Sequence, residues 1–436
     1  MTDHQPLLAT DRRSLLKLGG LGALGVGAAP LLSACGIKSS SGASGSDTVR
    51  IGYVSPQTGS LAPFGEADAF VVSQVKKIFA QKGLKIGGKK AKVEILVRDS
   101  QSDSKRAGDV ASDLILKSNV DLMLVSSTPD NTNPVSDQCE ANGVPCISTV
   151  APWQPWFLGR GGTTSKSFEW TYHFFWGLED VESVYMDMWG QVDSNQKVGA
   201  IWPNDSDGNA WGDAKTGFPP VVAKKGFSII DPGHYADGTT DFTAQISRFK
   251  SGNAELLAGV PIPPDFITFW KQAVQQQYQP KLATIGKALL FPSTISALGD
   301  TGNNLGTEVW WSPSHPFTSS LSGQSAKQLA DAYTASTSKQ WTQPIGFVHA
   351  LFEVASAALA KASSPSDKKG IVKALSTMRL STVVGDLDWT SGPVPNVAKT
   401  PLVGGQWRGD SKGYDLVIVS NADHPNIPAG GKVQPL

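Results

Sequence analysis

Strand-like runs and helix-like stretches alternate along this chain from residue 49 onward, and this alternation limits its fold more than any other feature. In the first series we expect strands and helices in turn at 49–54, 65–81, 92–98, 102–117, 121–125, 133–141 and 145–148. A second series repeats the alternation and includes a helix at 210–225 that Pro219 and Pro220 must bend or split. Strands joined by helices form parallel sheets with helices on their faces. The sequence therefore predicts an α/β protein with two lobes of similar build.

Length, charge and motifs argue against several functions. The 436 residues suffice for two or three domains of ordinary size. Lys and Arg number 38, as do Asp and Glu, so the balance gives no indication of nucleic-acid binding or of a polybasic membrane contact. The sequence has no H-E-x-x-H, G-x-S-x-G or phosphate-loop motif, and its six His are scattered. We therefore expect neither an enzyme nor a metal or cofactor site.

The first 35 residues are typical of an export signal. Arg12 and Arg13 resemble a twin-arginine pattern, and the apolar stretch at 18–34 is shorter than the roughly 20 residues that span a bilayer. It ends in L-S-A-C, which resembles the bacterial lipobox, so we expect Cys35 to carry lipid; an uncleaved anchor helix is the alternative. Ser and Gly dominate 36–48, which predicts a flexible tether. The folded body is then expected at the outer face of the cytoplasmic membrane.

Several short motifs together resemble one known family. The motifs are I-G-Y-V-S-P-Q-T-G at 51–59, F-G at 64–65, R-D-S-Q-S-D at 98–103, S-S-T at 126–128, N-P-V-S at 133–136, G-V-P-C-I-S at 143–148, N-D at 204–205, W-G at 211–212 and T-V-V-G-D-L at 382–387. In their order and spacing they are similar to the branched-chain amino-acid-type substrate-binding proteins of ABC importers. That family has the type I periplasmic binding fold.

The resemblance implies two Rossmann-like lobes with parallel central sheets, joined by a three-stranded hinge. Lobe 1 would comprise 49–176 and 312–383, and lobe 2 would comprise 177–311 and 384–436. It also implies that a small molecule binds between the lobes, at the carboxyl ends of strands, and that a monomeric binding protein delivers it to ABC permease subunits in the membrane. The alternatives are a ligand-sensing module for a signalling partner and an ordinary amino-acid binder.

Two positions depart from the way in which amino-acid binders of this family hold a zwitterion. Pro152 lies about where a Thr is expected to contact the carboxylate, and proline has neither a hydroxyl nor an N–H to offer. The Glu expected to contact the ammonium falls near 286–288, which has no acid. We therefore expect a ligand with an apolar or aromatic body rather than an ordinary branched-chain amino acid.

Aromatic residues supply the candidates for the ligand site. Nine of them lie between residues 153 and 176, which indicates a cleft walled by rings, although packing of the lobe is the alternative role for each ring. The positions that correspond to the family's cleft loops give the candidate ligand residues Phe64, Thr128, Trp153, Trp176, Trp211 and Lys287. Lys287 would pair with a ligand carboxylate, unless it is a solvated surface lysine.

Cys139 and Cys146 can meet across a turn at Asn142 and Gly143. Outside the cytoplasm a disulfide between them is favoured, and two buried free thiols are the alternative. No His or further Cys lies at ligand spacing, so we expect no metal there.

Overall fold

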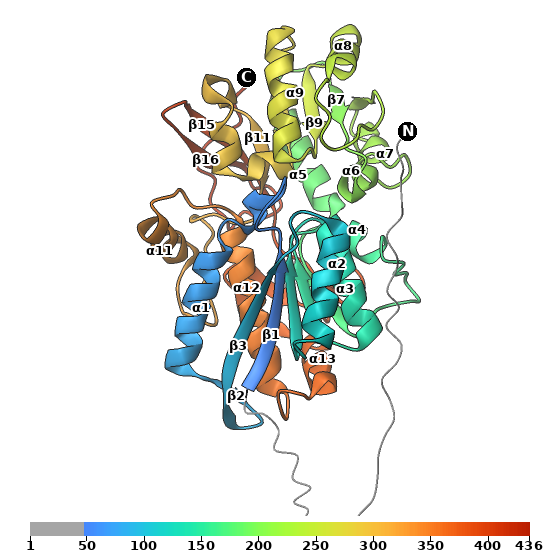
Figure 1. Cartoon of the computed structure of the whole chain (residues 1–436). Coiled ribbons are helices and arrows are strands. Elements are labelled where there is room, and N and C mark those ends of the chain that lie inside the picture. Colours follow the sequence, from blue (N-terminus) through green and yellow to red (C-terminus); the bar gives the residue numbers. More distant parts are fainter. Residues whose placement is uncertain (1–47) are drawn as a thin grey trace, which may run out of the picture. The chain divides into compact units, whose positions relative to one another are not determined.

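The structure is a computed structural model that describes residues 48–436. It contains two sheets of seven strands each (Figure 1). Strands of both sheets are mostly parallel and are joined by helices, which confirms the predicted two-lobed α/β class. The export pattern at Arg12 and Arg13, the lipobox Cys35 and the tether as far as residue 47 lie outside the described residues.

The first sheet forms the centre of one lobe. Its strands are, in spatial order, β14 (Val397–Ala398), β6 (Thr171–Phe174), β5 (Cys146–Thr149), β4 (Leu122–Ser126), β1 (Thr48–Ser55), β3 (Lys89–Asp99) and β2 (Leu84–Ile86). All neighbours pair in parallel except β2 and β3, which form an antiparallel hairpin. Ile51 and Tyr53 belong to the core cluster on one face of β1 and Val54 to the cluster on the other, as the two-residue period of a strand requires.

The second sheet forms the centre of the other lobe. Its strands are, in spatial order, β16 (Gly413–Ser420), β15 (Val403–Asp410), β11 (Gly306–Val309), β10 (Leu282–Ile285), β9 (Leu256–Gly259), β7 (Lys197–Ile201) and β8 (Ser228–Ile230). The strands from β8 to β11 pair in parallel, whereas β15 and β16 are antiparallel additions at one edge. A separate hairpin joins β12 (Arg379–Thr382) to β13 (Gly385–Asp388).

Helices pack on both faces of the first sheet, where α1 and α12 contact each other on one face and α2 and α3 on the other. The helices of this lobe are α1 (Asp68–Lys82), α2 (Ser104–Leu116), α3 (Pro129–Asn142), α4 (Trp153–Phe157), α11 (Ala326–Thr337), α12 (Pro344–Lys361) and α13 (Lys368–Ser376). Those of the second lobe are α5 (Leu178–Gly190), α6 (Ser206–Trp211), α7 (Phe218–Ala223), α8 (Thr243–Gly252), α9 (Pro263–Gln275) and α10 (Pro292–Ser296). Three short 3-10 turns are η1 (Ala62–Gly65), η2 (Lys287–Leu290) and η3 (Gly299–Gly302).

Helix α12 is the one helix of the described residues that is long and apolar enough to span a membrane. It is a core helix of the first lobe, because 78% of its apolar stretch is buried in the protein. It packs against α1, β2, β4 and β5.

The chain passes between the lobes three times, from β6 to α5, from β11 to α11 and from β14 to β15. Two of these crossings lie side by side, because the backbone N–H of Phe175 donates to the carbonyl oxygen of Ala398 at 3.1 Å. The ring of Phe175 also contacts that of Trp310, which lies in the remaining crossing from β11 to α11, with 5.4 Å between centroids. Strand β14 still pairs with β6, although we assigned residues from 384 onward to the second lobe. A strand of two residues has no period that the sequence could reveal.

The predicted helix at 210–225 is two helices, α6 and α7. Pro219 and Pro220 lie in the first turn of α7, where a missing N–H is harmless, so they start a helix rather than bend one. Similarly, α3 begins at Pro129, four residues before the predicted start at 133.

The predicted disulfide is absent, because Cys139 and Cys146 are both free and buried. They belong to the apolar cluster between α3 and the first sheet. Burial raises the pKa of the Cys139 thiol well above its ordinary value. A neutral thiol is a poor nucleophile for disulfide formation, and both residues act here as small apolar side chains.

Asp68 ties α1 to β1 from inside the protein. Its carboxylate accepts hydrogen bonds from the hydroxyl of Tyr53 at 2.8 Å and from that of Ser55. Burial raises the pKa of Asp68 to about 7, although both hydrogen bonds oppose the shift. At a pH between the ordinary pKa of an aspartate and this raised pKa, Asp68 therefore holds a proton in the folded state that it has released in the unfolded chain.

We expect Asp68→Asn to flatten the pH dependence of stability. In the wild type, the contribution of this group to the free energy of unfolding falls as pH rises from about 4 to about 7 and then levels off, because the folded state binds the extra proton. The loss should be on the order of a few kcal/mol. Urea unfolding at about pH 5 and about pH 8 measures it, with the exposed Asp109→Asn as control. An Asp68→Asn variant that keeps the wild-type slope would contradict this role.

Candidate functional site

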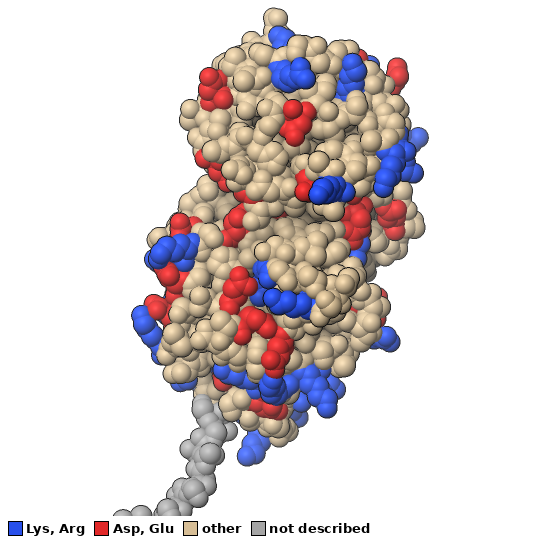
Figure 2. All heavy atoms as spheres, turned by 90° about the vertical axis from the view of Figure 1, so that its right-hand side faces the viewer, with Lys and Arg blue, Asp and Glu red and all other residues tan. Residues whose placement is uncertain are grey.

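A cavity lies between the two lobes at the carboxyl ends of strands from both sheets. Its volume is about 20 Å³, room for roughly one water molecule, so in this closed form it is far smaller than the range of about 300–1,000 Å³ for ligand pockets. The lining residues follow the ends of β4, β5 and β6 in the first lobe and of β7, β9 and β10 in the second, and the space-filling view narrows between the lobes (Figure 2). They are Phe64, Thr128, Val150, Pro152, Phe175, Trp176, Asp207, Trp211, Val260, Lys287, Leu290, Glu308 and Trp310.

Contacts between the lobes hold them together at two places near the cavity. Phe64 of the first lobe packs edge-on against Phe291 of the second, with 4.8 Å between ring centroids. Asp130, in the first turn of α3, accepts hydrogen bonds from the hydroxyl of Ser206 at 2.6 Å and from its backbone N–H at 3.2 Å. The structure is therefore a closed form of a two-lobed clamp.

Three tryptophans that line the cavity have an indole N–H without a partner. The Nε1 atoms of Trp176, Trp211 and Trp310 are buried, and within residues 48–436 nothing accepts a hydrogen bond from them. Each buried donor left unpaired costs about 1–3 kcal/mol. All three residues line the cavity, although the Nε1 of Trp202, which does not line it, is unpaired as well.

Lys287 is buried in a cluster of ions. Its Nζ lies 2.5 Å from Asp205 Oδ2 and 3.1 Å from Asp207 Oδ2. Burial alone would lower the pKa of Lys287, but the two carboxylates raise it above its ordinary value. Lys287 is therefore not a solvated surface lysine, and two aspartates already pair with its charge.

Asp207 has one oxygen free of this cluster. Oδ1 is buried and has no hydrogen-bond partner among the described residues. Desolvation raises the pKa of Asp207 to about 7, although the charge of Lys287 opposes the shift. With one lysine against Asp205 and Asp207, the cluster carries one net negative charge at the cavity wall above about pH 7, where Asp207 is ionised, and no net charge below it.

Glu308 adds a second acid at the cavity. It accepts a hydrogen bond from the Tyr185 hydroxyl at 2.6 Å and one from the backbone N–H of Lys287 at 3.4 Å. Burial raises its pKa above the ordinary value. Gly286 has no room for a side chain, since a Cβ there would come within 2.9 Å of the Trp211 ring and 3.0 Å of the Glu308 carboxylate.

Two cavity residues have strained backbones. Val150 and Lys287 have φ angles of 70° and 53°, in the left-handed region that non-glycine residues avoid. Such a conformation costs about 1–3 kcal/mol and persists where surrounding contacts impose it, often at ligand sites. Here it places both residues in the cavity wall.

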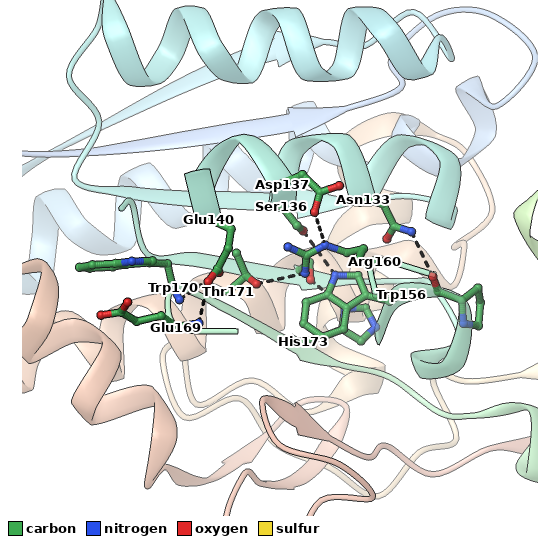
Figure 3. A network of polar contacts seen from close by, with 12 residues as sticks. Asn133, Ser136, Asp137, Glu140, Trp156, Arg160, Glu169, Trp170, Thr171 and His173 are labelled. Carbon is green, nitrogen blue, oxygen red and sulfur yellow. Dashed lines mark hydrogen bonds and ion pairs between the residues drawn. The ribbon is translucent and has the colours of Figure 1, made fainter. Parts of the chain in front are cut away.

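Arg160 holds the segment after β5 against α3 (Figure 3). Its side chain is 1% exposed and its Nε lies 2.7 Å from Asp137 Oδ1, while Nη1 donates to the Thr171 hydroxyl at 3.0 Å. The guanidinium also lies over the rings of Phe168 and Trp156, at 4.0 and 4.8 Å from their centroids. These contacts fix α4, and with it the cavity-lining residues that precede it.

The structure brings five of the six predicted ligand residues to the cavity: Phe64, Thr128, Trp176, Trp211 and Lys287. Trp153 is not among the lining residues. Its indole N–H donates to Glu179 Oε1 at 3.0 Å, so this ring packs against the start of α5 instead.

Sequence reasoning missed the acids and one of the tryptophans. We found no acid near the expected second-lobe position, yet Asp207 and Glu308 both line the cavity. Asp207 and Trp310 each follow a strand whose carboxyl end faces the cavity. Ligands of α/β sheets bind at such ends, so this rule could have identified both residues from the sequence. Glu308 lies within β11, where only the three-dimensional structure reveals its direction.

Solved structures with the same fold are solute-binding proteins. A leucine-binding protein, LivK, from Thermotoga maritima MSB8 has 18% identity and a TM-score of 0.70, with 86% of this chain and 99% of that chain covered. LivJ from Streptococcus pneumoniae in complex with isoleucine has 16% identity and a TM-score of 0.67, with 86% and 99% covered. A solute-binding protein of an ABC transporter from R. palustris in complex with 4-hydroxybenzoate has 16% identity and a TM-score of 0.68, with 86% and 96% covered.

A family match extends over most of the sequence. The family described as periplasmic binding protein matches residues 48–412, which include both sheets except β16. The interlobe cavity lies wholly inside the matched range. The chain belongs to the periplasmic binding protein family.

Proposed function

We propose that this chain is the substrate-binding component of an ABC importer and that it captures a small molecule in the cavity between its lobes. Membership of the periplasmic binding protein family and the closed, two-lobed structure support this function. The export pattern at Arg12 and Arg13 and the lipobox at Cys35 support an anchored position at the outer face of the cytoplasmic membrane. The protein binds its solute as a monomer and passes it to permease subunits.

The observation that carries this proposal is the set of unpaired polar atoms around the cavity. The indole N–H groups of Trp176, Trp211 and Trp310 need acceptors, and Asp207 Oδ1 needs a donor. A ligand with an oxygen acceptor and a separate N–H or ammonium donor satisfies both requirements. Its apolar body packs against Phe64, Phe175 and the other rings of the wall.

The charge of the cavity restricts the charge of the ligand. Above about pH 7, where Asp207 is ionised, the cluster of Lys287, Asp205 and Asp207 carries one net negative charge, and Glu308 adds a further acid. A carboxylate ligand without an ammonium would meet these acids and find no free cation among the lining residues described. We therefore infer a ligand that is neutral, zwitterionic or cationic overall. An amino acid with an aromatic or apolar side chain remains within this class.

Four compounds that share a phenyl ring test the charge rule. Phenethylamine is a cation, phenylalanine a zwitterion, phenylacetamide neutral and phenylpropionate an anion. Calorimetric titration should give phenylpropionate the weakest affinity, by at least about tenfold, because one repulsive contact of about 1.4 kcal/mol suffices for that factor. Equal or tighter binding of the anion would refute the charge rule, and binding of none of the four would refute a ring-bodied ligand.

Trp211→Phe and Trp310→Phe keep a ring and remove the N–H. Each should weaken binding of the tightest compound in the phenyl series about tenfold, because its acceptor oxygen then loses a donor. Trp407→Phe is the matched control, since this buried indole N–H donates to the Leu289 carbonyl and does not line the cavity. Unchanged affinity in both cavity variants would show that these donors do not hold the ligand.

A further inference from the structure

Seven lysines and no acidic residue occur between residues 69 and 93. All seven are exposed. They lie on the second half of α1, on the β2–β3 hairpin and at the start of β3. We name this surface the lysine base: Lys76, Lys77, Lys82, Lys85, Lys89, Lys90 and Lys92.

Four members of the lysine base, Lys76, Lys85, Lys90 and Lys92, share one continuous surface. Lys85 and Lys90 stand directly opposite each other in the β2–β3 hairpin. The side chain of Lys90 reaches the end of α1, since a Cβ on Gly83 would meet its Cε at 2.6 Å. A surface groove is lined by Lys76 of α1 together with Lys90 and Lys92 of β3.

None of these lysines has an acidic partner in the described part of the chain, although Glu94, which pairs with Arg50 at 3.3 Å, lines the same groove. Lys82 donates to the carbonyl oxygen of Leu321 at 3.0 Å, and no ion pair within residues 48–436 includes any of the seven. Like charges directly opposite in a hairpin are destabilising. Basic side chains also predominate at the lower end of the space-filling view (Figure 2). The whole chain has 38 basic and 38 acidic residues, so its composition gave no indication that lysines cluster on one surface.

The lysine base lies at the end of the first lobe that is remote from the cavity. Lys89 and Lys92 are at the start of β3, and both β1 and β3 run from this end toward the cavity (Figure 1). The eight residues of β1 span about 26 Å at a rise of about 3.3 Å per residue. Binding to this surface therefore leaves the cavity mouth uncovered.

In the sequence, the expected anchor precedes the strand β1, which begins at this end. Thr48 pairs with Lys92 in the first sheet and follows Cys35 by 13 residues. Thirteen residues reach at most about 45 Å. If Cys35 carries lipid, as the proposed function holds, the tether cannot take the lysine base farther than this from the membrane.

We propose that the lysine base docks the first lobe on an anionic lipid surface. Lysines near such a surface each add attraction, which extends only over a Debye length of about 8 Å at physiological salt. The clustered charges therefore act together only when this end of the lobe faces the membrane. Docking holds the cavity away from the lipid in a fixed orientation.

Lysines on an edge strand also discourage aggregation, and β2 is an edge strand of the first sheet. That role accounts for Lys85, which is the one lysine of β2. It does not account for Lys76, Lys77 and Lys82, which lie on a helix. A membrane surface accounts for all seven.

Co-sedimentation with lipid vesicles tests the proposal on the full chain. The base variant is Lys85→Gln, Lys89→Gln and Lys90→Gln together; the control variant is Lys224→Gln, Lys225→Gln and Lys271→Gln, at exposed positions of the second lobe. Both variants lose three positive charges. Residues before 48 are the same in each, so any affinity of those residues for lipid contributes equally and cancels when the two variants are compared. Phosphatidylglycerol vesicles supply the anionic surface and phosphatidylcholine vesicles the neutral one.

We expect the base variant to bind the anionic vesicles at least about tenfold more weakly than the wild type, and the control variant to bind within about twofold of it. Added salt should remove most of the difference. Equal losses in the two variants, or no loss in the base variant, would overturn the proposal. A second variant with Lys76, Lys77 and Lys82 changed to Gln should repeat the loss, and phenyl-series binding should stay unchanged in all three variants.

Discussion

The buried ammonium of Lys287 decides what the cavity can hold. It is the only cation among the lining residues described, and Asp205 and Asp207 lie within 3.1 Å of it. Taking such ions out of water costs several kcal/mol per ion unless each finds a partner. The arrangement therefore neutralises the lysine and leaves one excess negative charge and one free carboxylate oxygen. The ligand must supply what this cluster and the three indole N–H groups lack.

The first lobe has two functional ends because its strands are parallel. The carboxyl ends of β4, β5 and β6 deliver residues to the cavity, and the opposite end carries the lysine base. A parallel sheet thus separates the ligand site from the surface that we propose for the membrane. Arg160 contributes to the first end, because its contacts with Asp137 and Thr171 hold the segment that follows β5.

The fold could be predicted from the sequence because it depends on local patterns. Val49, Ile51 and Tyr53 alternate along β1, and the strands expected at 121–125 and 145–148 correspond to β4 and β5. The site depends on contacts between distant residues, which one sequence does not reveal. Lys287 pairs with Asp205, which lies 82 residues earlier in the sequence. Trp153 donates a hydrogen bond to Glu179 and does not line the cavity. Cys139 and Cys146 are near each other as expected, but their shared apolar cluster, rather than their spacing, determines their state.

A crystal structure of the protein with the ligand that co-purifies from its own cells would show which ligand atoms contact the unpaired groups around the cavity. We expect a small molecule between the lobes with an oxygen within about 3.2 Å of at least one of the indole nitrogens of Trp176, Trp211 and Trp310. We also expect a nitrogen or hydroxyl donor at the same distance from Asp207 Oδ1. A ligand that places a carboxylate against Asp207, or that displaces this aspartate to pair with Lys287, would refute the binding scheme proposed for the cavity.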